Sequence, residues 1–160
     1  MVVSGIVATR IDILAVGGLS RDLKPAFEHY RRLLAPLCEL GVREVREYEL
    51  RGRPADDVLR DEGRRLLAAW PRRGVVVALA VEGRTHDSPG LARRLQEWLE
   101  RGGVTFVVGG SLGLAPDVVD RAHERLSLSS LTLPHQLARV VLAEQLFRAL
   151  KIARREPYHH

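Results

Sequence analysis

The residues with the most evident chemistry in this 160-residue sequence lie in its last third. A glycine-rich turn, GGSLG, occupies residues 109–113 directly after an apolar run. A turn of this kind between a strand and a helix lets the backbone approach a ligand closely. The alternative is a tight turn that needs glycine for a positive φ and binds nothing. The turn lacks the spaced glycines of a dinucleotide fingerprint and the Walker lysine, which argues against nicotinamide and nucleoside triphosphate cofactors.

Hydroxyl side chains recur soon after this turn, within residues 127–134. Hydroxyls placed so closely can supply several hydrogen bonds to a polar ligand. Alternatively, Ser127, Ser129 and Thr132 cap or pair with the neighbouring backbone. His135 follows in the first turn of an expected helix, where the helix dipole disfavours a cationic imidazole. A lone histidine at such a position is usually structural, so both interpretations stay open.

The last helix and the residues after it carry further candidates. Glu144 and Arg148 are four residues apart, which is the spacing of an ion pair on one helix face, although a solvated surface pair contributes little. The sequence then ends in PYHH, which indicates a tail that docks in order to act. The six histidines, Cys38 and the acids show no metal-ligand spacing, so no metal is expected. No Gly-x-Ser-x-Gly elbow supports a serine hydrolase.

These groups must be positioned by elements that alternate between strand and helix. Expected strands are residues 11–16, 42–50, 75–81, 104–108 and 126–133, and expected helices are 20–40, 54–70, 88–101, 116–125 and 134–152. The alternation predicts an α/β fold with a largely parallel sheet and helices on both faces. We interpret residues 1–10 as an N-terminal extension and residues 11–160 as a single domain.

Composition narrows the class of protein. Apolar residues make up 46% of the chain, enough for one buried core, and no segment is long enough to span a membrane. A single cysteine cannot form an internal disulfide, and no leader-like segment is evident, so we expect a cytoplasmic protein. The 25 basic residues exceed the 20 acidic ones. This excess makes a polyanionic partner plausible, although arginine usage in a GC-rich genome would produce it too.

Four segments, in their order and spacing, resemble the RlmH family of ribosomal RNA methyltransferases, which are small enzymes of the SPOUT superfamily. They are the GGSLG turn after a strand, LSSLTLPHQ, RVVLAEQLFRALKI and the final PYHH. The resemblance covers residues 11–160 and implies a C-terminal trefoil knot and a homodimer. It also implies methyl transfer from S-adenosylmethionine to N3 of a pseudouridine in large-subunit rRNA (23S rRNA), on the assembled ribosome.

The resemblance also implies which residues act. The implied cofactor-binding positions are Leu79, Gly109, Gly110, Leu128, Ser129, Ser130, Leu131, Thr132, Leu133 and Pro134. The implied catalytic positions are His135, Glu144, Arg148, Tyr158 and His159, some of them facing the partner's cofactor. Arg148 would stabilise the anion that forms on the base. His159 or Glu144 would accept the N3 proton, and Tyr158 would stack on the base or bond to it.

Two alternatives remain open at this point. One is a SPOUT methyltransferase that acts on tRNA, and the other is a non-catalytic ribosome-binding protein with the same fold. A Gly110→Val variant is expected to lose cofactor affinity because the new side chain would fill the space of the ligand.

Overall fold

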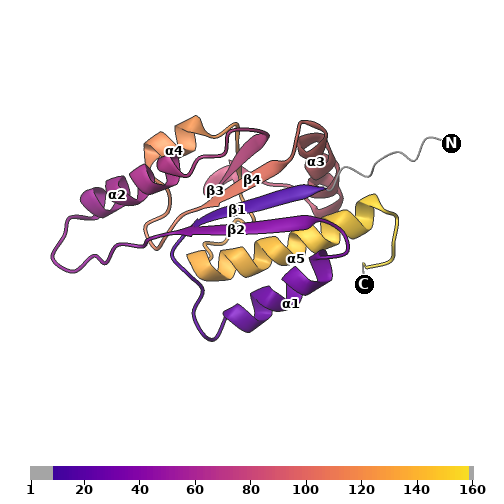
Figure 1. Ribbon diagram of the computed structural model, residues 1–160, viewed down its shortest axis with the longest axis horizontal. Helices are drawn as coiled ribbons and strands as arrows, with labels where there is room; N and C mark the ends of the chain where they lie inside the picture. The colour runs from indigo at the N-terminus through magenta and orange to yellow at the C-terminus, as the bar shows by residue number, and fades with distance from the viewer. Residues whose placement is uncertain (1–8, 159–160) are drawn as a thin grey trace.

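The computed structural model describes residues 9–158 and contains five strands (Figure 1). They are β1 (Arg10–Val16), β2 (Glu39–Val45), β3 (Val75–Arg84), β4 (Val104–Val108) and β5 (Glu124–Leu126). The strands are all parallel and lie in the order β2-β1-β4-β3-β5. The parallel sheet expected from the sequence is confirmed.

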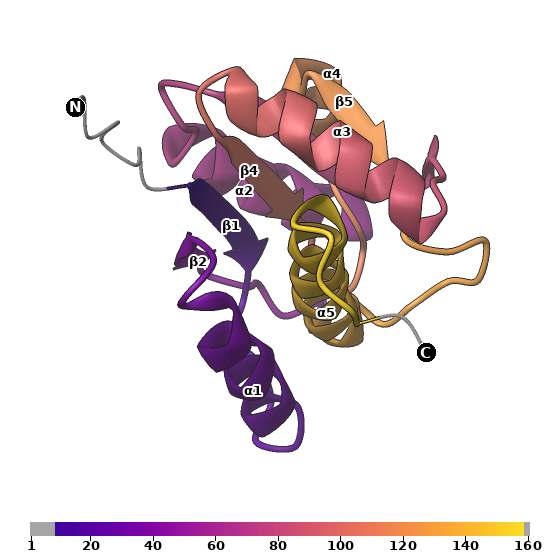
Figure 2. The same ribbon diagram turned by 90° about the vertical axis from the view of Figure 1, so that its right-hand side faces the viewer.

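Helices cover both faces of this sheet, also as expected (Figure 2). The helices are α1 (Lys24–Leu34), α2 (Ala55–Ala68), α3 (Ser88–Glu100), α4 (Pro116–Arg121) and α5 (His135–Ala153). Helices α1, α3 and α5 pack on one face, and α2 and α4 on the other. None of the helices within residues 9–158 has the length and apolarity that a membrane crossing needs.

The two central strands are buried from both sides. On β1, Ile11 and Ile13 face the core beneath α1, α3 and α5, while Leu14 and Val16 face the core beneath α2 and α4. All residues of β4 are buried. A strand covered on both faces must be apolar throughout, which explains the continuous apolar run at residues 104–108.

The segment after β5 departs from the sequence prediction. We expected a strand over residues 126–133, but pairing ends at Leu126 and a loop follows. In this loop the Ser127 hydroxyl donates to the carbonyl of Ser129, and the Ser129 hydroxyl accepts from the backbone N–H of Leu131. Side chains that bond to the nearby backbone compete with a strand ladder, which accounts for the early end of the strand.

Strand β2 also lies earlier in the sequence than the expected residues 42–50. Gly41, which directly follows the helix expected over residues 20–40, lies within β2 opposite Asp12. A Cβ atom at Gly41 would lie 2.1 Å from the Asp12 carboxylate, which pairs with Arg10. Arg10 also bonds to Glu39 at 2.8 Å and is the first residue of β1. The glycine is therefore needed to accommodate this ion pair across two strands.

Candidate functional site

A cavity of about 780 Å³ opens at the carboxyl ends of β3, β4 and β5. Its walls come from three segments: the end of β3, the glycine-rich turn after β4, and the loop between β5 and α5. Ligands of α/β proteins typically bind at this edge of the sheet, in cavities of about 300–1,000 Å³. The cavity is therefore the best candidate for a cofactor site.

The structure gathers at this cavity nearly all the residues for which the sequence predicted cofactor binding. Those that line it are Leu79, Gly109, Gly110, Leu128, Ser129, Leu131, Thr132, Leu133 and Pro134. Ser130 lies in the same loop but is exposed and does not line the cavity. His135, predicted as catalytic, also lines it.

The glycine turn is closed by a hydrogen bond of 3.0 Å from the Gly113 N–H to the Gly110 carbonyl. Positive φ occurs at Gly113, at 80°, and neither Gly109 nor Gly110 has it. A Cβ atom at Gly109 would lie 2.3 Å from the Gly113 carbonyl oxygen, so the turn leaves no room for a side chain there. A Cβ atom at Gly110 would meet Glu62 and Val16, neither of which lines the cavity. The steric reason expected for a Gly110→Val effect is therefore wrong, because that side chain would disturb the packing behind the turn.

The charge of the cavity wall differs from that of the whole chain. Among the described lining residues, Glu82 is the only one with a formal charge, and arginine and lysine are missing. Arginine and lysine are the usual partners of phosphate groups. A wall without them, in a chain with 25 basic residues, suits an uncharged or positively charged ligand better than a phosphorylated one.

A polar cluster that sequence reasoning missed lies behind the cavity, at the ends of β1 and β2. The Arg139 side chain is 1% exposed, donates to the Gly17 carbonyl at 2.6 Å and lies 3.3 Å from Glu44. Burial lowers the pKa of Arg139, and Glu44 opposes this shift. The His135 Nε2 atom lies 3.6 Å from a Glu47 carboxylate oxygen. These contacts fix the start of α5 against the sheet.

A second cluster lies near the other end of α5. The Arg148 Nη2 atom lies 2.5 Å from Glu144 Oε1, and its guanidinium carbon lies 4.8 Å from the centre of the Tyr158 ring. The Tyr158 hydroxyl lies 3.5 Å from the same Glu144 oxygen, and its ring packs edge-on against Phe147. The structure thus joins three of the residues predicted as catalytic. His159 lies outside the described residues.

Protonation within this cluster favours donors of hydrogen bonds. The bond to Glu144 raises the pKa of Arg148, so the guanidinium stays cationic. Burial, followed by the charge of Glu144, raises the pKa of Tyr158, so the phenol stays protonated at neutral pH. Arg148 and Tyr158 can therefore both donate to a substrate oxygen, but neither is suited to remove a proton.

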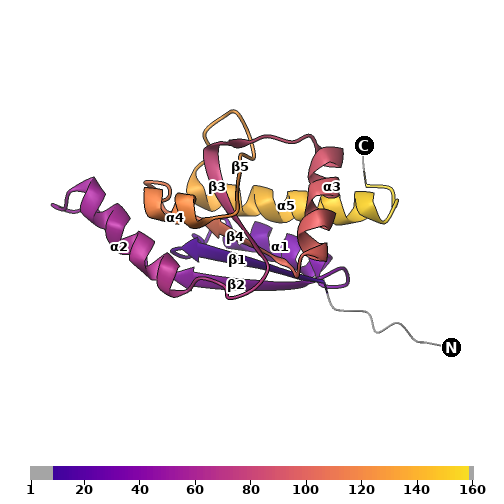
Figure 3. The same ribbon diagram turned by 90° about the horizontal axis from the view of Figure 1, so that it is seen from above.

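The cavity and this cluster are separated within one chain. Arg148 lies 13 residues beyond His135 on α5, which corresponds to about 20 Å along the helix axis. The cavity loop meets the start of α5, and the C-terminal tail returns along its far end (Figure 3). Glu144, Arg148 and Tyr158 do not line the cavity. One chain alone does not bring all the predicted site residues together.

No three His, Cys, Asp or Glu side chains in the described part of the chain gather closely enough to hold a metal ion.

Comparison with known proteins gives consistent results. Residues 9–159 match the family described as "Predicted SPOUT methyltransferase". A protein of Rubrobacter xylanophilus named "Ribosomal RNA large subunit methyltransferase H" is 47% identical over 154 residues, which are 94% of this chain and 98% of that protein. A protein of Gemmatimonas aurantiaca with the same name is 45% identical over 94% of this chain and 99% of its own. A solved structure titled "Probable Methyltransferase" from Bordetella pertussis is similar in fold, with a TM-score of 0.55, 15% identity, and coverage of 89% of this chain and 95% of that one.

Proposed function

Because this chain belongs to the SPOUT methyltransferase family, we propose that it transfers a methyl group from S-adenosylmethionine to large-subunit ribosomal RNA. The observation that carries the proposal is the cavity at the ends of β3, β4 and β5, which combines a glycine turn with an apolar wall free of lysine and arginine among its described residues. The relatives named for the same reaction support the choice of RNA.

The cavity fits this cofactor in size and in charge. Its apolar side chains can enclose an adenine ring, and backbone groups of the turn and of the loop before α5 can bond to the polar edges of the ring and the ribose. Bound there, the cofactor supplies an electrophilic methyl group. A lining without lysine or arginine among its described residues agrees with such a ligand better than with a nucleotide polyphosphate.

On the RNA side we propose N3 of a pseudouridine as the acceptor, on the assembled ribosome. The N3 proton must leave before the nitrogen can attack, and negative charge then spreads to the neighbouring carbonyl oxygens of the base. Arg148 would hold this charge by donating to one oxygen, and the protonated Tyr158 hydroxyl would donate to another or stack on the ring. Glu144 and His159 are the candidates for accepting the proton.

The separation of the two clusters supports a composite site in a homodimer. Since about 20 Å of α5 lie between His135 and Arg148, we propose that the Arg148 cluster of one protomer faces the cavity of its partner. The exposed apolar side chains Val81 and Leu131 lie on the cavity lining, where a partner would cover them. The cytoplasm, where ribosomes work, is the proposed compartment.

Family membership also supports our proposal that the C-terminal part of the chain is threaded as a trefoil knot. Helix α5 packs against both α1 and α3, and it directly follows the loop that lines the cavity. A threaded loop would keep the cavity wall rigid without a ligand.

The proposed function is tested by transfer of labelled methyl groups from S-adenosylmethionine to ribosomes that lack the modification, with free subunits and tRNA in parallel. We expect label in large-subunit RNA of whole ribosomes, at N3 of a pseudouridine after nuclease digestion and mass spectrometry. Label in tRNA would show that the proposed substrate is wrong and that tRNA is the methyl acceptor. The absence of label from every RNA would contradict the proposal that the protein is a methyltransferase.

The turn offers a sharper test of the cofactor site. Gly109→Ala places a Cβ atom against the Gly113 carbonyl, so the turn must open, and affinity for S-adenosylmethionine is expected to fall at least about tenfold. Isothermal titration calorimetry measures this change. Gly52→Ala is the matched control, because Gly52 has a φ of 67° and open space around it. This control should lose some stability but keep its affinity, and wild-type affinity in the Gly109→Ala variant would move the cofactor elsewhere.

A further inference from the structure

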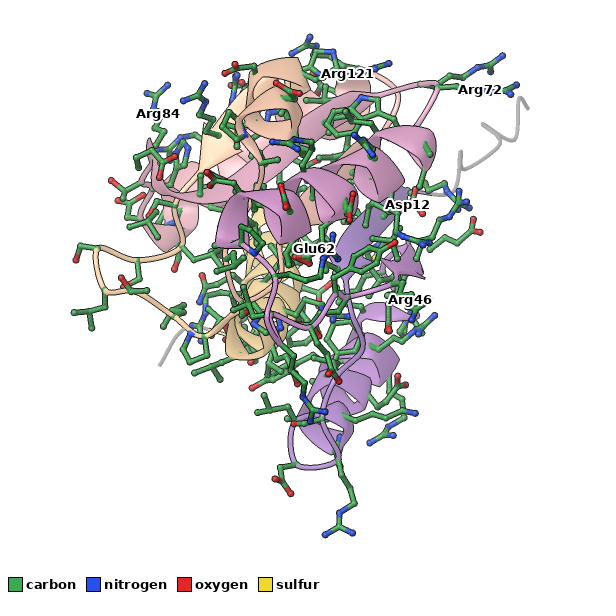
Figure 4. The ribbon with its side chains drawn as sticks, turned by 90° about the vertical axis from the view of Figure 1, so that its left-hand side faces the viewer. Asp12, Arg46, Glu62, Arg72, Arg84 and Arg121 are labelled. Carbon is green, nitrogen blue, oxygen red and sulfur yellow. The ribbon has the colours of Figure 1, made fainter. Side chains whose placement is uncertain are left out.

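A buried carboxylate lies directly behind the glycine turn of the cavity. Glu62 of α2 is 3% exposed, and its two carboxylate oxygens lie 3.0 and 3.3 Å from the position that a Cβ atom of Gly110 would occupy. Within the described residues its Oε2 atom has no hydrogen-bond partner. Figure 4 shows Glu62 near the centre of the molecule beneath α2, whereas Arg72 and Arg121 lie at the outer margin. Gly110 lines the cavity and therefore lies between the cavity and the Glu62 carboxylate.

The surroundings of Glu62 carry a surplus of negative charge. Glu47, which follows β2, lies close enough to repel the Glu62 carboxylate, and Glu44 of β2 lies beside Arg139 of α5. His135 of α5 faces Glu47. Glu44 and Glu47 thus share the buried guanidinium of Arg139, whereas the charge that acts on Glu62 is the negative one of Glu47. Glu82 of β3 adds a further acidic group to the cavity lining.

Burial raises the pKa of Glu62 to about 7, and repulsion by Glu47 adds to this shift, while a hydrogen bond from the Tyr48 backbone opposes it. The carboxylate therefore changes its charge close to neutral pH. A positive charge bound in the adjacent cavity would favour its ionised form.

We propose that Glu62 is a specificity-determining residue that acts through the Gly110 wall and makes the cavity prefer S-adenosylmethionine over the product S-adenosylhomocysteine. The inference rests on the proposed function, since it assumes that this cofactor occupies the cavity. Transfer of the methyl group breaks its bond to sulfur, the bonding electrons stay on the sulfur, and the sulfonium becomes a neutral thioether. The negative charge of Glu62 behind the wall attracts the cationic sulfonium of S-adenosylmethionine and not the neutral thioether of S-adenosylhomocysteine. The product is therefore released more readily than the cofactor.

The linkage between binding and protonation fixes the sign of the pH dependence. If bound S-adenosylmethionine stabilises ionised Glu62, then ionised Glu62 binds S-adenosylmethionine more tightly by the same factor. Its affinity therefore rises as the pH rises through about 7, whereas the affinity for S-adenosylhomocysteine stays nearly constant. A decrease of about one pKa unit on binding gives a rise of roughly fivefold between about pH 6 and about pH 8.

The experiment is calorimetric titration of the full chain with each of the two ligands across this pH range. Glu62→Gln keeps the size of the side chain and removes its charge, so the preference for S-adenosylmethionine should fall about tenfold at the upper end of the range and lose its pH dependence. The affinity for S-adenosylhomocysteine should not change. Asp56→Asn is the matched control, because Asp56 is an exposed acid on the same helix, and it should behave as the wild type.

Further variants keep the test decisive. Glu62→Asp retains a carboxylate and should show the pH dependence that Glu62→Gln lacks. Glu47→Gln should move the midpoint of the pH dependence to lower pH, because Glu47 contributes to the raised pKa of Glu62. His135→Asn must also keep the dependence, because it leaves Glu62 and the Gly110 wall in place. An unchanged ligand preference in Glu62→Gln, or, if that variant does not fold, an unmoved midpoint in Glu47→Gln, would overturn the inference. A wild type that binds neither ligand would instead contradict the proposed function itself.

Discussion

Replacing Arg148 by alanine is expected to reduce methyl transfer to ribosomes by about a hundredfold to a thousandfold. In the structure Arg148 is the cation of the cluster with Glu144 and Tyr158, and its raised pKa keeps it charged. Removal of one such donor to a developing anion typically costs this much in rate. The affinity for S-adenosylmethionine should stay within about twofold, because Arg148 does not line the cavity of its own chain and would meet only the reacting base.

Single-turnover methyl transfer and calorimetric binding, measured on the same preparation, separate these two effects. Arg154→Ala is a suitable control, because Arg154 is an exposed arginine directly after the last residue of α5. It should slow the reaction less than about threefold. A fully active Arg148→Ala variant would remove Arg148 from the chemistry. Parallel loss of activity and thermal stability would instead assign it a structural role.

Replacing Arg139 by alanine should destabilise the protein by about 3 kcal/mol. The Arg139 side chain is 1% exposed, and its loss leaves the Gly17 carbonyl without its bond and Glu44 without its partner. It also leaves an unfilled volume between α5 and the sheet. Because Glu44 is 44% exposed and can regain water, we place the cost at the lower end of the range for a broken buried pair.

Urea unfolding should show this loss directly, and the melting temperature should fall by roughly 6–12 °C. Arg43→Ala on β2 is the control, because Arg43 is exposed and its removal should change the melting temperature by no more than about 2 °C. A similarly small change for Arg139→Ala would mean that the buried guanidinium contributes nothing net to stability. Replacement by methionine, which refills part of the volume, should recover some of the loss.

The fold was largely predictable because its core strands are apolar on both faces. The continuous apolar segments that form β3 and β4 are typical of parallel strands covered by helices on both faces. Errors arose where polar side chains override local patterns. Ser127 and Ser129 form hydrogen bonds to the nearby backbone, and the strand ends before them. Gly41 resembles a residue that ends a helix, but it lies in a strand and leaves room for the ion pair of Asp12 and Arg10.

The site was predictable where short motifs line one cavity, and less so where it depends on tertiary contacts. The glycine turn and the loop before α5 meet in space as the resemblance implied. Glu62 was not predicted as a site residue, although the sequence contains a signal for it. Glu62 shares a helix face with Val58 and Leu66, each four residues away. A carboxylate on such an apolar stripe must be buried. The distance between His135 and Arg148 could also be predicted, because it follows from the rise per residue of a helix. The proposed composite site could not be predicted in this way, because it depends on contacts with a second chain.

The position of β1 in the middle of the sheet has a consequence for synthesis on the ribosome. One edge of β1 pairs with β2 soon after both are made, but the other edge pairs with β4, in a register that joins Ile11 to Val104. Until more than half of the chain has emerged, an apolar strand keeps one edge open to wrong partners. Folding must also close a long loop before this pairing forms, which favours slow folding and makes chaperones useful to the nascent chain.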